Sequence, residues 1–189
     1  RECNMNSIDE VLNATMLLAD FHNVMHGEDA SKYGLKYKKD RYLPRRYSKW
    51  CGRMLKFQRI IQNKKIRTEF DIKYYDNIKE NYLQGIMALN LLSQSNYDDF
   101  LRKARYEKHI CNRNYYCHNV LLDQSQTYYM TGFERLIIDI RMHDLGRFIR
   151  KLMSQDEYMW DFEKCSEVIK SYDSIINISK QELGILLSI

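Results

Sequence analysis

The sequence Asn112-Arg-Asn-Tyr-Tyr-Cys-His-Asn119-Val-Leu-Leu-Asp123 interrupts a chain that otherwise follows a helical pattern. Next to it, His109-Ile-Cys111, Val120-Leu-Leu122 and Tyr128-Tyr-Met130 are short runs of apolar and aromatic residues, a pattern typical of strands. A polar turn separates the second run from the third, which predicts a β-hairpin. The sequence therefore predicts a small β element that carries an irregular loop over residues 112–118.

Apolar residues recur at helical spacing on both sides of this element, and one proline and seven glycines leave little to interrupt helices. The predicted helices cover about residues 8–26, 47–63, 68–93, 95–107, 142–153, 160–173 and 179–188. Four of them have a capping residue at the start: Ser7, Ser95, Asp161 and Ser179. The second helix has four apolar residues that we expect to face inward: Trp50, Met54, Phe57 and Ile61. The expected fold class is mainly α (α+β), with helices around a small β-hairpin.

The chain has 189 residues, of which 44% are hydrophobic and 29% are charged. This length suits one domain, and this composition excludes disordered, collagen-like and coiled-coil proteins. No apolar run approaches the roughly 18–20 residues of a membrane span, and the N-terminus is neither a signal nor a transit peptide. Because the first residue is Arg1 rather than Met, we expect a longer native chain. Five scattered cysteines favour reduced thiols, with a bridge or metal site at Cys111 and Cys117 as the alternative.

The net charge of +5 conceals an uneven distribution. Residues 35–67 contain thirteen Lys and Arg against one acid, so this segment carries +12 and the remainder carries −7. It includes most of a basic loop at residues 27–46 and the start of the second helix. One interpretation is a solvated loop and helix face; the other is a site for an anionic polymer or an acidic protein. The residues of this anionic-partner patch are Arg45, Arg46, Lys49 and Arg53. No nucleic-acid-binding motif is present, and no specific nucleic acid is expected.

Three segments carry a resemblance to a known family: residues 112–123, Gly132-Phe-Glu134 and His143-Asp-Leu-Gly-Arg-Phe148. In order and spacing they resemble the catalytic half of the aminoglycoside phosphotransferase and choline kinase-like superfamily. Within it, the chain is most similar to spore coat proteins of the CotS type. The similarity extends from Arg1-Glu-Cys3 to the last helix. It implies the C-terminal lobe of a protein kinase-like fold over residues 1–189, without the N-lobe and its glycine-rich loop.

The resemblance also assigns the positions that matter for phosphoryl transfer, which needs a carboxylate near the acceptor hydroxyl and oxygen ligands for the metal. Asn114 stands at the position of the family's catalytic Asp, and Asn112 at that of its preceding His. Asn119 matches the metal-ligand Asn. Gly132 stands at the position of the metal-ligand Asp, two residues before Glu134. Both carboxylates are therefore missing, and we expect catalysis to be impaired.

Two further residues follow from the same comparison. Asp144 resembles the family's structural Asp, which braces the backbone of the catalytic loop. His118, beside Asn119, is a remaining candidate base, although the sequence positions no carboxylate to orient it. We expect no cofactor for this chain; ATP and Mg²⁺ are expected only if an N-lobe is present and activity is retained.

The resemblance implies a catalytically impaired kinase-like component of a bacterial spore coat, acting in coat assembly or binding. Its expected partners are other spore coat proteins, with no membrane contact, and its expected location is the mother-cell cytoplasm and then the spore coat. The alternative is an ATP-dependent phosphotransferase that needs an upstream N-lobe. Its acceptor would be an alcohol group of an aminoglycoside, choline, homoserine or similar molecule.

Overall fold

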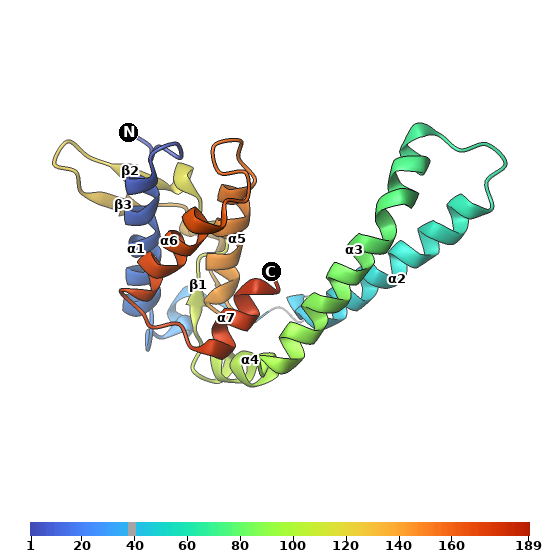
Figure 1. The fold of residues 1–189 in the computed structure, drawn as a ribbon. Helices are drawn as coiled ribbons and strands as arrows, with labels where there is room; N and C mark the ends of the chain where they lie inside the picture. Colours follow the sequence, from blue (N-terminus) through green and yellow to red (C-terminus); the bar gives the residue numbers. More distant parts are fainter. Residues whose placement is uncertain (38–40) are drawn as a thin grey trace.

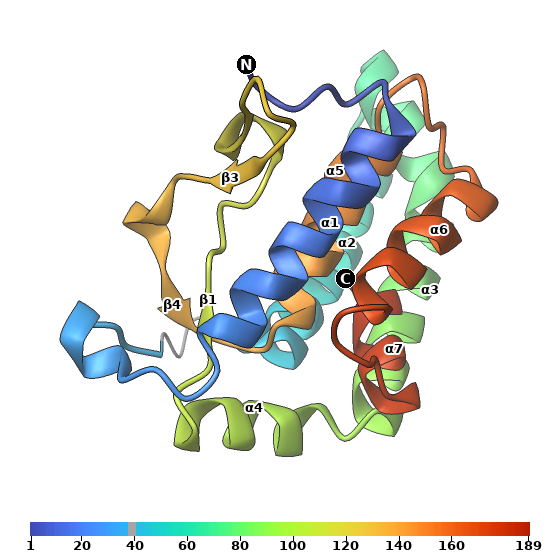
Figure 2. The same cartoon turned by 90° about the vertical axis from the view of Figure 1, so that its left-hand side faces the viewer.

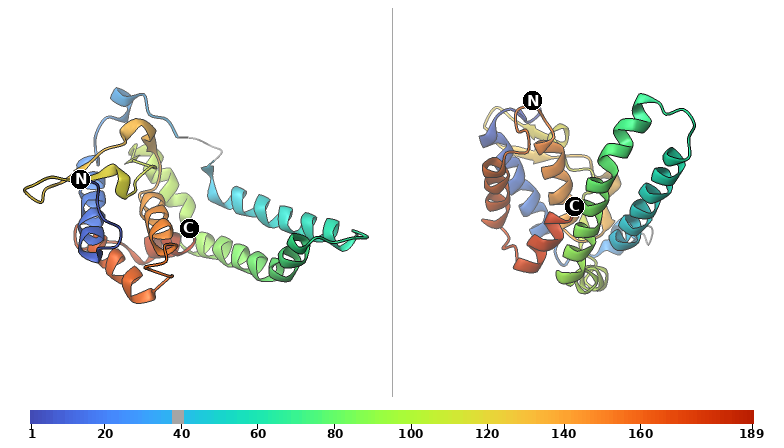
Figure 3. Two further views of the ribbon diagram at one scale, coloured as in Figure 1. Left: turned by 90° about the horizontal axis from the view of Figure 1, so that it is seen from above. Right: turned by 45° about the vertical axis from the view of Figure 1, so that its right-hand side comes forward.

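The computed structural model describes residues 1–37 and 41–189. Lys38, Lys39 and Asp40 of the basic loop lie outside the described residues, so the structure does not bear on their part of the predicted patch. The described chain forms a body from which an arm of two long helices projects (Figure 1). The body holds both chain termini and the loop at residues 112–119, and the arm lies to one side of it (Figure 3).

The arm consists of α2 (Leu43–Gln62) and α3 (Glu69–Gln94), which pack against each other along their length. The predicted start of α2 at residue 47 is four residues too late, because Pro44 was expected in the loop and lies in the first turn of the helix. Proline fits the first helical turn, where its missing N–H has no intrahelical partner to lose. At the other end of the arm, Thr68 begins α3 with a capping box that includes Asp71.

Two of the four residues expected to face inward from α2 are exposed instead. Trp50 is 41% exposed and Phe57 is 51% exposed, whereas Ile61 is buried at 4%. The physical reason is that, in the described part of the chain, α2 packs mainly on α3, and only its first turns lie against the body. Cys51 makes part of the close contact, since its Sγ lies 2.6 Å from where a Cβ on Gly85 would stand. A helix pattern alone does not reveal how many neighbours a helix has.

The core of the body is built on α5 (Met142–Met153), whose Leu145, Phe148 and Leu152 are completely buried. This helix contacts α6 (Phe162–Asp173) and α7 (Lys180–Leu187), and α1 (Ile8–Val24) packs on α6 (Figure 2). The predicted bounds of α5 are confirmed to the residue. Three predicted caps are also confirmed, because their side chains accept hydrogen bonds from the first turn of α1, α6 and α7: Ser7, Asp161 and Ser179.

The fourth predicted cap, Ser95, is wrong. Its backbone N–H donates to Leu91 O, so Ser95 belongs to the end of α3. Helix α4 (Tyr97–Tyr106) begins after Asn96, which adopts a left-handed backbone with φ of 53° and makes no side-chain cap. A capping serine needs an extended backbone, and this position is held close to helical by the turn between the two helices.

The predicted hairpin is confirmed: β2 (Val120–Leu122) pairs with β3 (Tyr128–Met130) in antiparallel register. The first predicted strand, β1 (Ile110–Cys111), pairs with β4 (Ile137–Ile138), a strand that the sequence analysis missed. The N-terminal residues also join the hairpin through a bridge between Glu2 and Leu121. The two residues of β4 show no alternation that would separate a strand from another short apolar run.

The five cysteines are free, so the alternative bridge between Cys111 and Cys117 is not formed. Four of them are buried and act as small packing groups. In the described part of the chain, no helix combines the length and apolar character that a bilayer span requires.

Candidate functional site

The loop at residues 112–119 is held between the two strand pairs. It leaves β1, which is fixed by β4, and it ends in the 3-10 helix η3 (Cys117–Asn119), which leads directly into β2. The facing segment, residues 131–136, contains a second 3-10 helix, η4 (Phe133–Arg135). The two segments meet because Thr131 N–H donates to Asn119 O at 2.8 Å. Residues that are far apart in the sequence thereby form one site.

Asp144 of α5 fixes the beginning of this loop. Its two carboxylate oxygens accept hydrogen bonds from Asn112 N at 2.6 Å and Arg113 N at 2.8 Å. The carboxylate is buried at 3% exposure and also lies 3.2 Å from His22 Nε2 of α1. His22 Nδ1 in turn lies 2.7 Å from the hydroxyl of Tyr172 on α6. The loop is thus connected to three helices of the body through one buried acid.

The asparagine side chains of the loop form hydrogen bonds mostly with the loop and with the facing segment. Asn112 is fully buried; its side-chain nitrogen donates to Gly132 O, and its oxygen accepts from Asn114 N. The side-chain nitrogen of Asn119 donates to Asn114 O at 2.7 Å. Asn114 is half-buried, and its side-chain nitrogen lies 3.4 Å from a carboxylate oxygen of Glu134. The structure therefore brings together all five positions that the resemblance assigned to catalysis and metal binding.

Gly132 is tightly enclosed as well as lacking a carboxylate. It has a left-handed backbone with φ of 77°, and a Cβ added to it would stand 2.7 Å from Cγ of Asn119. The Asn119 amide therefore occupies the space that a side chain at position 132 would enter. A carboxylate cannot be restored at this position unless Asn119 moves.

We expect Gly132→Asp to destabilise the chain by about 1–3 kcal/mol, because overpacking a close contact costs roughly that much. Chemical denaturation of the variant and the parent chain measures the difference. Adding Asn119→Ala to the Gly132→Asp variant should recover part of the lost stability, since the amide in the way is removed. Equal stability of Gly132→Asp and the parent chain would contradict this account of the contact.

The residues present do not fit the Mg²⁺ ions that phosphoryl transfer uses. Mg²⁺ prefers several oxygen ligands, at least one or two of them carboxylates, and it gives up water reluctantly. Here Glu134 is the sole carboxylate among the five assigned positions, and Asn114 already contacts it. Asn119 contributes one amide oxygen, and Gly132 contributes no side chain. We therefore derive no catalytic step through a metal ion.

A pocket of about 290 Å³ opens beside Asn114, and its lining is strongly cationic. It brings together positive side chains from the loop, from η4 and from α5: Arg113, Arg135, Arg147, Arg150 and Lys151. Among the described residues, the one carboxylate in the lining is that of Asp144, which accepts hydrogen bonds from the loop backbone. We call this the cationic pocket.

The α5 residues of the cationic pocket influence one another. The pKa of Lys151 is lowered, first by partial burial and then by the positive charges of Arg147, Arg150 and Arg135. Its ammonium lies 4.7 Å from the ring centre of Tyr116, while Arg147 donates to Arg113 O. Counting charge along the chain does not reveal this cluster, because its residues come from three separate segments. The signal that could have found it is the spacing of Arg147, Arg150 and Lys151 on one face of a helix.

The anionic-partner patch on α2 is divided by the fold. Arg46 places its guanidinium 4.8 Å from the ring centre of Trp50, which also stacks on Tyr47. Arg45 lies toward α4, where it lines a separate hollow with Asp98 and Arg102. Lys49 and Arg53 are exposed on the arm. The four residues thus face more than one surface.

Tyr47, beside this patch, is anchored to the body. Its hydroxyl donates to Ser188 O near the C-terminus, and burial raises its pKa. Arg150, Arg46 and Arg147 act in the opposite direction on the same tyrosine. Positive charges at the base of the arm and on α5 thus act on the same tyrosine.

His118 lies outside this cluster, on the surface. It is exposed, and its Nδ1 lies 2.8 Å from a carboxylate oxygen of Glu2. The expectation that no carboxylate would orient this histidine is wrong. Glu2 reaches it because the N-terminal residues pair with β2, which brings together two residues 116 positions apart in the sequence.

Comparison with solved structures places this geometry in a known fold. The structure superposes on the aminoglycoside phosphotransferase from Alicyclobacillus acidocaldarius with a TM-score of 0.82, over 98% of the present chain. The chain has a kinase-like fold. Sequence identity to that protein is 17%, and no protein-family model matches the chain. The kinase-like chain covers 53% of the solved protein, so it spans about half of its length.

Proposed function

We propose that this chain is a catalytically impaired kinase-like lobe that binds an anionic partner. The observation that carries the proposal is the cationic pocket beside Asn114, at the position where the resembling family keeps its catalytic carboxylate. Loss of two acids removes the groups that orient a hydroxyl and hold a metal. Five positive side chains in the lining favour the opposite kind of ligand, because a bound anion relieves their mutual repulsion.

The positive charge of the cationic pocket also disfavours the cationic substrates of the alternative function. Aminoglycosides and choline are cations at neutral pH, and Mg²⁺ is a cation as well. Each would have to approach the cationic pocket against the field of its arginines and lysine. A carboxylate or phosphate group would instead meet paired donors, since guanidinium groups bind both in a two-point geometry.

An anionic partner suits a role in assembly. The resemblance to spore coat proteins of the CotS type suggests that the partner is another coat protein with an acidic segment. We accordingly propose that the chain acts in coat assembly, first in the mother-cell cytoplasm and then in the coat. An assembly role needs the packing of the body and an accessible binding surface, and it does not need the missing carboxylates.

Incubation of the chain with labelled ATP, Mg²⁺ or Mn²⁺, and a panel of amino alcohols should give no phosphorylated product above background. The physical reason is that a missing general base alone removes a factor of roughly 10² to 10⁴ in rate. Asn119→Ala serves as the matched control for any signal. Turnover that Asn119→Ala abolishes would contradict the proposal of impaired catalysis.

A second candidate function rests on the length of the solved neighbour. Because the chain covers 53% of that phosphotransferase, the present residues match about half of a complete enzyme of that kind. A phosphotransferase assembled with an upstream N-lobe is therefore the alternative. The same ATP assay on the full native protein distinguishes the two, because an N-lobe would supply phosphate contacts that the present chain does not contain.

A further inference from the structure

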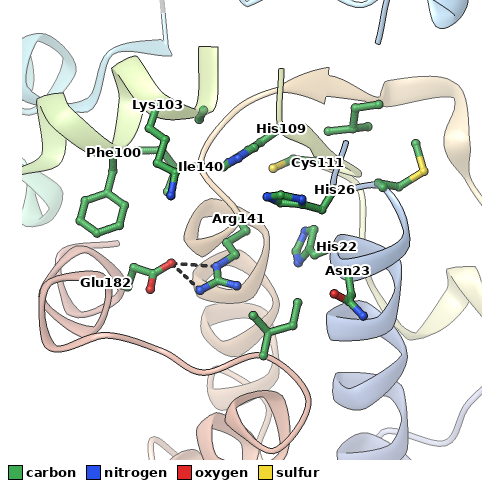
Figure 4. Close-up of a pocket in the computed structure, with 14 residues that line it drawn as sticks. His22, Asn23, His26, Phe100, Lys103, His109, Cys111, Ile140, Arg141 and Glu182 are labelled. Carbon is green, nitrogen blue, oxygen red and sulfur yellow. Dashed lines mark hydrogen bonds and ion pairs between the residues drawn. The ribbon is translucent and has the colours of Figure 1, made fainter. Parts of the chain in front are cut away.

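The end of α1, the end of α4 and the start of β1 meet beside a second pocket, of about 380 Å³. His26 and His109 both line this pocket and lie near each other in Figure 4. Glu107, at the end of α4, contacts both of them. Its Oε2 lies 2.7 Å from His109 Nε2 and 3.9 Å from His26 Nε2. Three side chains from separate elements thus converge on one point.

We propose that His26, Glu107 and His109 form a binding site for a divalent transition-metal ion of the zinc type. Their potential ligand atoms all lie within 4.8 Å of one another. Donor atoms around a tetrahedral Zn²⁺ stand about 3.4 Å apart, as bond lengths near 2.1 Å require. Small side-chain rotations are therefore enough to bring the three donors to a common ion.

The backbone holds each of the three residues in place. The N–H of His26 donates to Asn23 O, that of Glu107 to Lys103 O, and that of His109 to Ala104 O. Between Glu107 and His109, Lys108 adopts a left-handed backbone with φ of 55°. This conformation is uncommon for a residue with a side chain, and it turns the side chains before and after it toward the same point.

The type of donor indicates the type of ion. Two imidazoles and one carboxylate suit zinc and its neighbours in the first transition row, whereas Mg²⁺ and Ca²⁺ prefer oxygen alone. Three protein ligands leave a fourth position for water, as is usual where a zinc site is open. A hydrogen bond between Glu107 and His109 alone would not account for the placement of His26 toward the same carboxylate oxygen.

A second cluster, deeper in the body, is a poorer candidate. The ligand atoms of His22, Cys111 and Asp144 also lie within 4.8 Å of one another. However, Asp144 is occupied by the loop backbone, and His22 Nδ1 by the hydroxyl of Tyr172. A metal ion there would have to break the bonds that hold the loop. A metal ion at the surface cluster would replace only the contacts among His26, Glu107 and His109.

The proposed ion would connect the body to the root of the arm. Helix α1 belongs to the body, and α4 directly follows α3 of the arm in the chain. A bond from His26 to Glu107 and His109 through one ion would fix the end of α4 against α1. Metal binding is therefore expected to raise the melting temperature of the chain, because an ion that binds the folded state alone stabilises it.

Calorimetric titration of the tag-free chain with ZnCl₂ should show one binding site per chain. His26→Ala and His109→Ala should each weaken binding at least about tenfold, since even loss of an outer-shell partner of a metal ligand has an effect of that size. Replacement of Zn²⁺ by Co²⁺ adds a visible absorption band as a second readout, which both variants should lose.

The matched control is His118→Ala, which removes an exposed histidine that also contacts a carboxylate, at 2.8 Å from Glu2, but belongs to none of the metal-ligand clusters among the described residues. It should leave Zn²⁺ binding unchanged. Cys111→Ser tests the buried cluster and should also leave binding unchanged. The proposal is overturned if the parent chain binds no Zn²⁺, if His26→Ala binds as well as the parent, or if Cys111→Ser is the variant that loses binding.

Discussion

Asp144→Ala should destabilise the chain strongly, although nothing in the proposed function gives this residue a catalytic task. The substitution removes the acceptor of two backbone N–H groups, those of Asn112 and Arg113, and both are held by carboxylate bonds shorter than 3 Å. Each buried donor left without a partner costs about 1–3 kcal/mol. For a chain of this size, each kcal/mol corresponds to roughly 2–4 °C in melting temperature, which thermal unfolding followed by circular dichroism will measure.

Asp123→Ala is the matched control for this prediction. Asp123 also accepts two backbone hydrogen bonds, from Ser125 N and Thr127 N, but it does so on an exposed turn. Water can replace its carboxylate there, so the loss should be smaller. If Asp144→Ala melts at the same temperature as Asp123→Ala or above it, the buried carboxylate does not support the loop as described.

Reversing two charges of the cationic pocket should abolish most of its affinity for polyanions. We expect Arg150→Glu with Lys151→Glu to weaken binding of a fluorescent polyglutamate probe by about tenfold or more at low salt, because clefts of one charge sign concentrate counter-ions by such factors. The difference from the parent chain should shrink as ionic strength approaches ~1 M, where the Debye length is about 3 Å. Fluorescence anisotropy across a salt series measures both effects.

Two further variants show where the anion binds. Lys170→Glu with Lys180→Glu makes the same change in net charge at exposed positions outside the cationic pocket, and it should have a much smaller effect. Arg45→Glu, Arg46→Glu and Lys49→Glu together test the patch at the base of the arm. If all three variants bind polyglutamate equally, the effect belongs to the net charge of the chain and the cationic pocket is not a site. Inorganic polyphosphate, used as a second probe, shows whether the pocket distinguishes carboxylates from phosphates.

Several features of this protein follow from its sequence alone, because they depend on neighbours in the chain. Helix α5 was predicted with its observed bounds, since its apolar positions repeat with a helical period and no proline interrupts it. The hairpin of β2 and β3 was predicted because its two runs stand on either side of a short polar turn. The absence of both carboxylates at positions 114 and 132 is likewise a property of the sequence, seen once the resemblance sets the spacing.

Other features were decided by contacts between distant residues. Trp50 and Phe57 have the same spacing as buried residues, and they are exposed because the arm leaves α2 with one main neighbour. Strand β4 exists because β1 lies beside it, and Glu2 reaches His118 because the N-terminus joins the hairpin.

The two proposed sites also depend on contacts between residues that are distant in the sequence. The sequence placed its basic segment at residues 35–67, yet the cationic pocket draws Arg113, Arg135 and Lys151 from three separate elements. The cluster of His26, Glu107 and His109 likewise joins a helix end to a strand start across some 80 residues of chain. A sequence shows which residues are charged and which can bind a metal. Electrostatic interactions and metal coordination, however, depend on the distances between those side chains. Only the tertiary structure decided which of these side chains share a point in space.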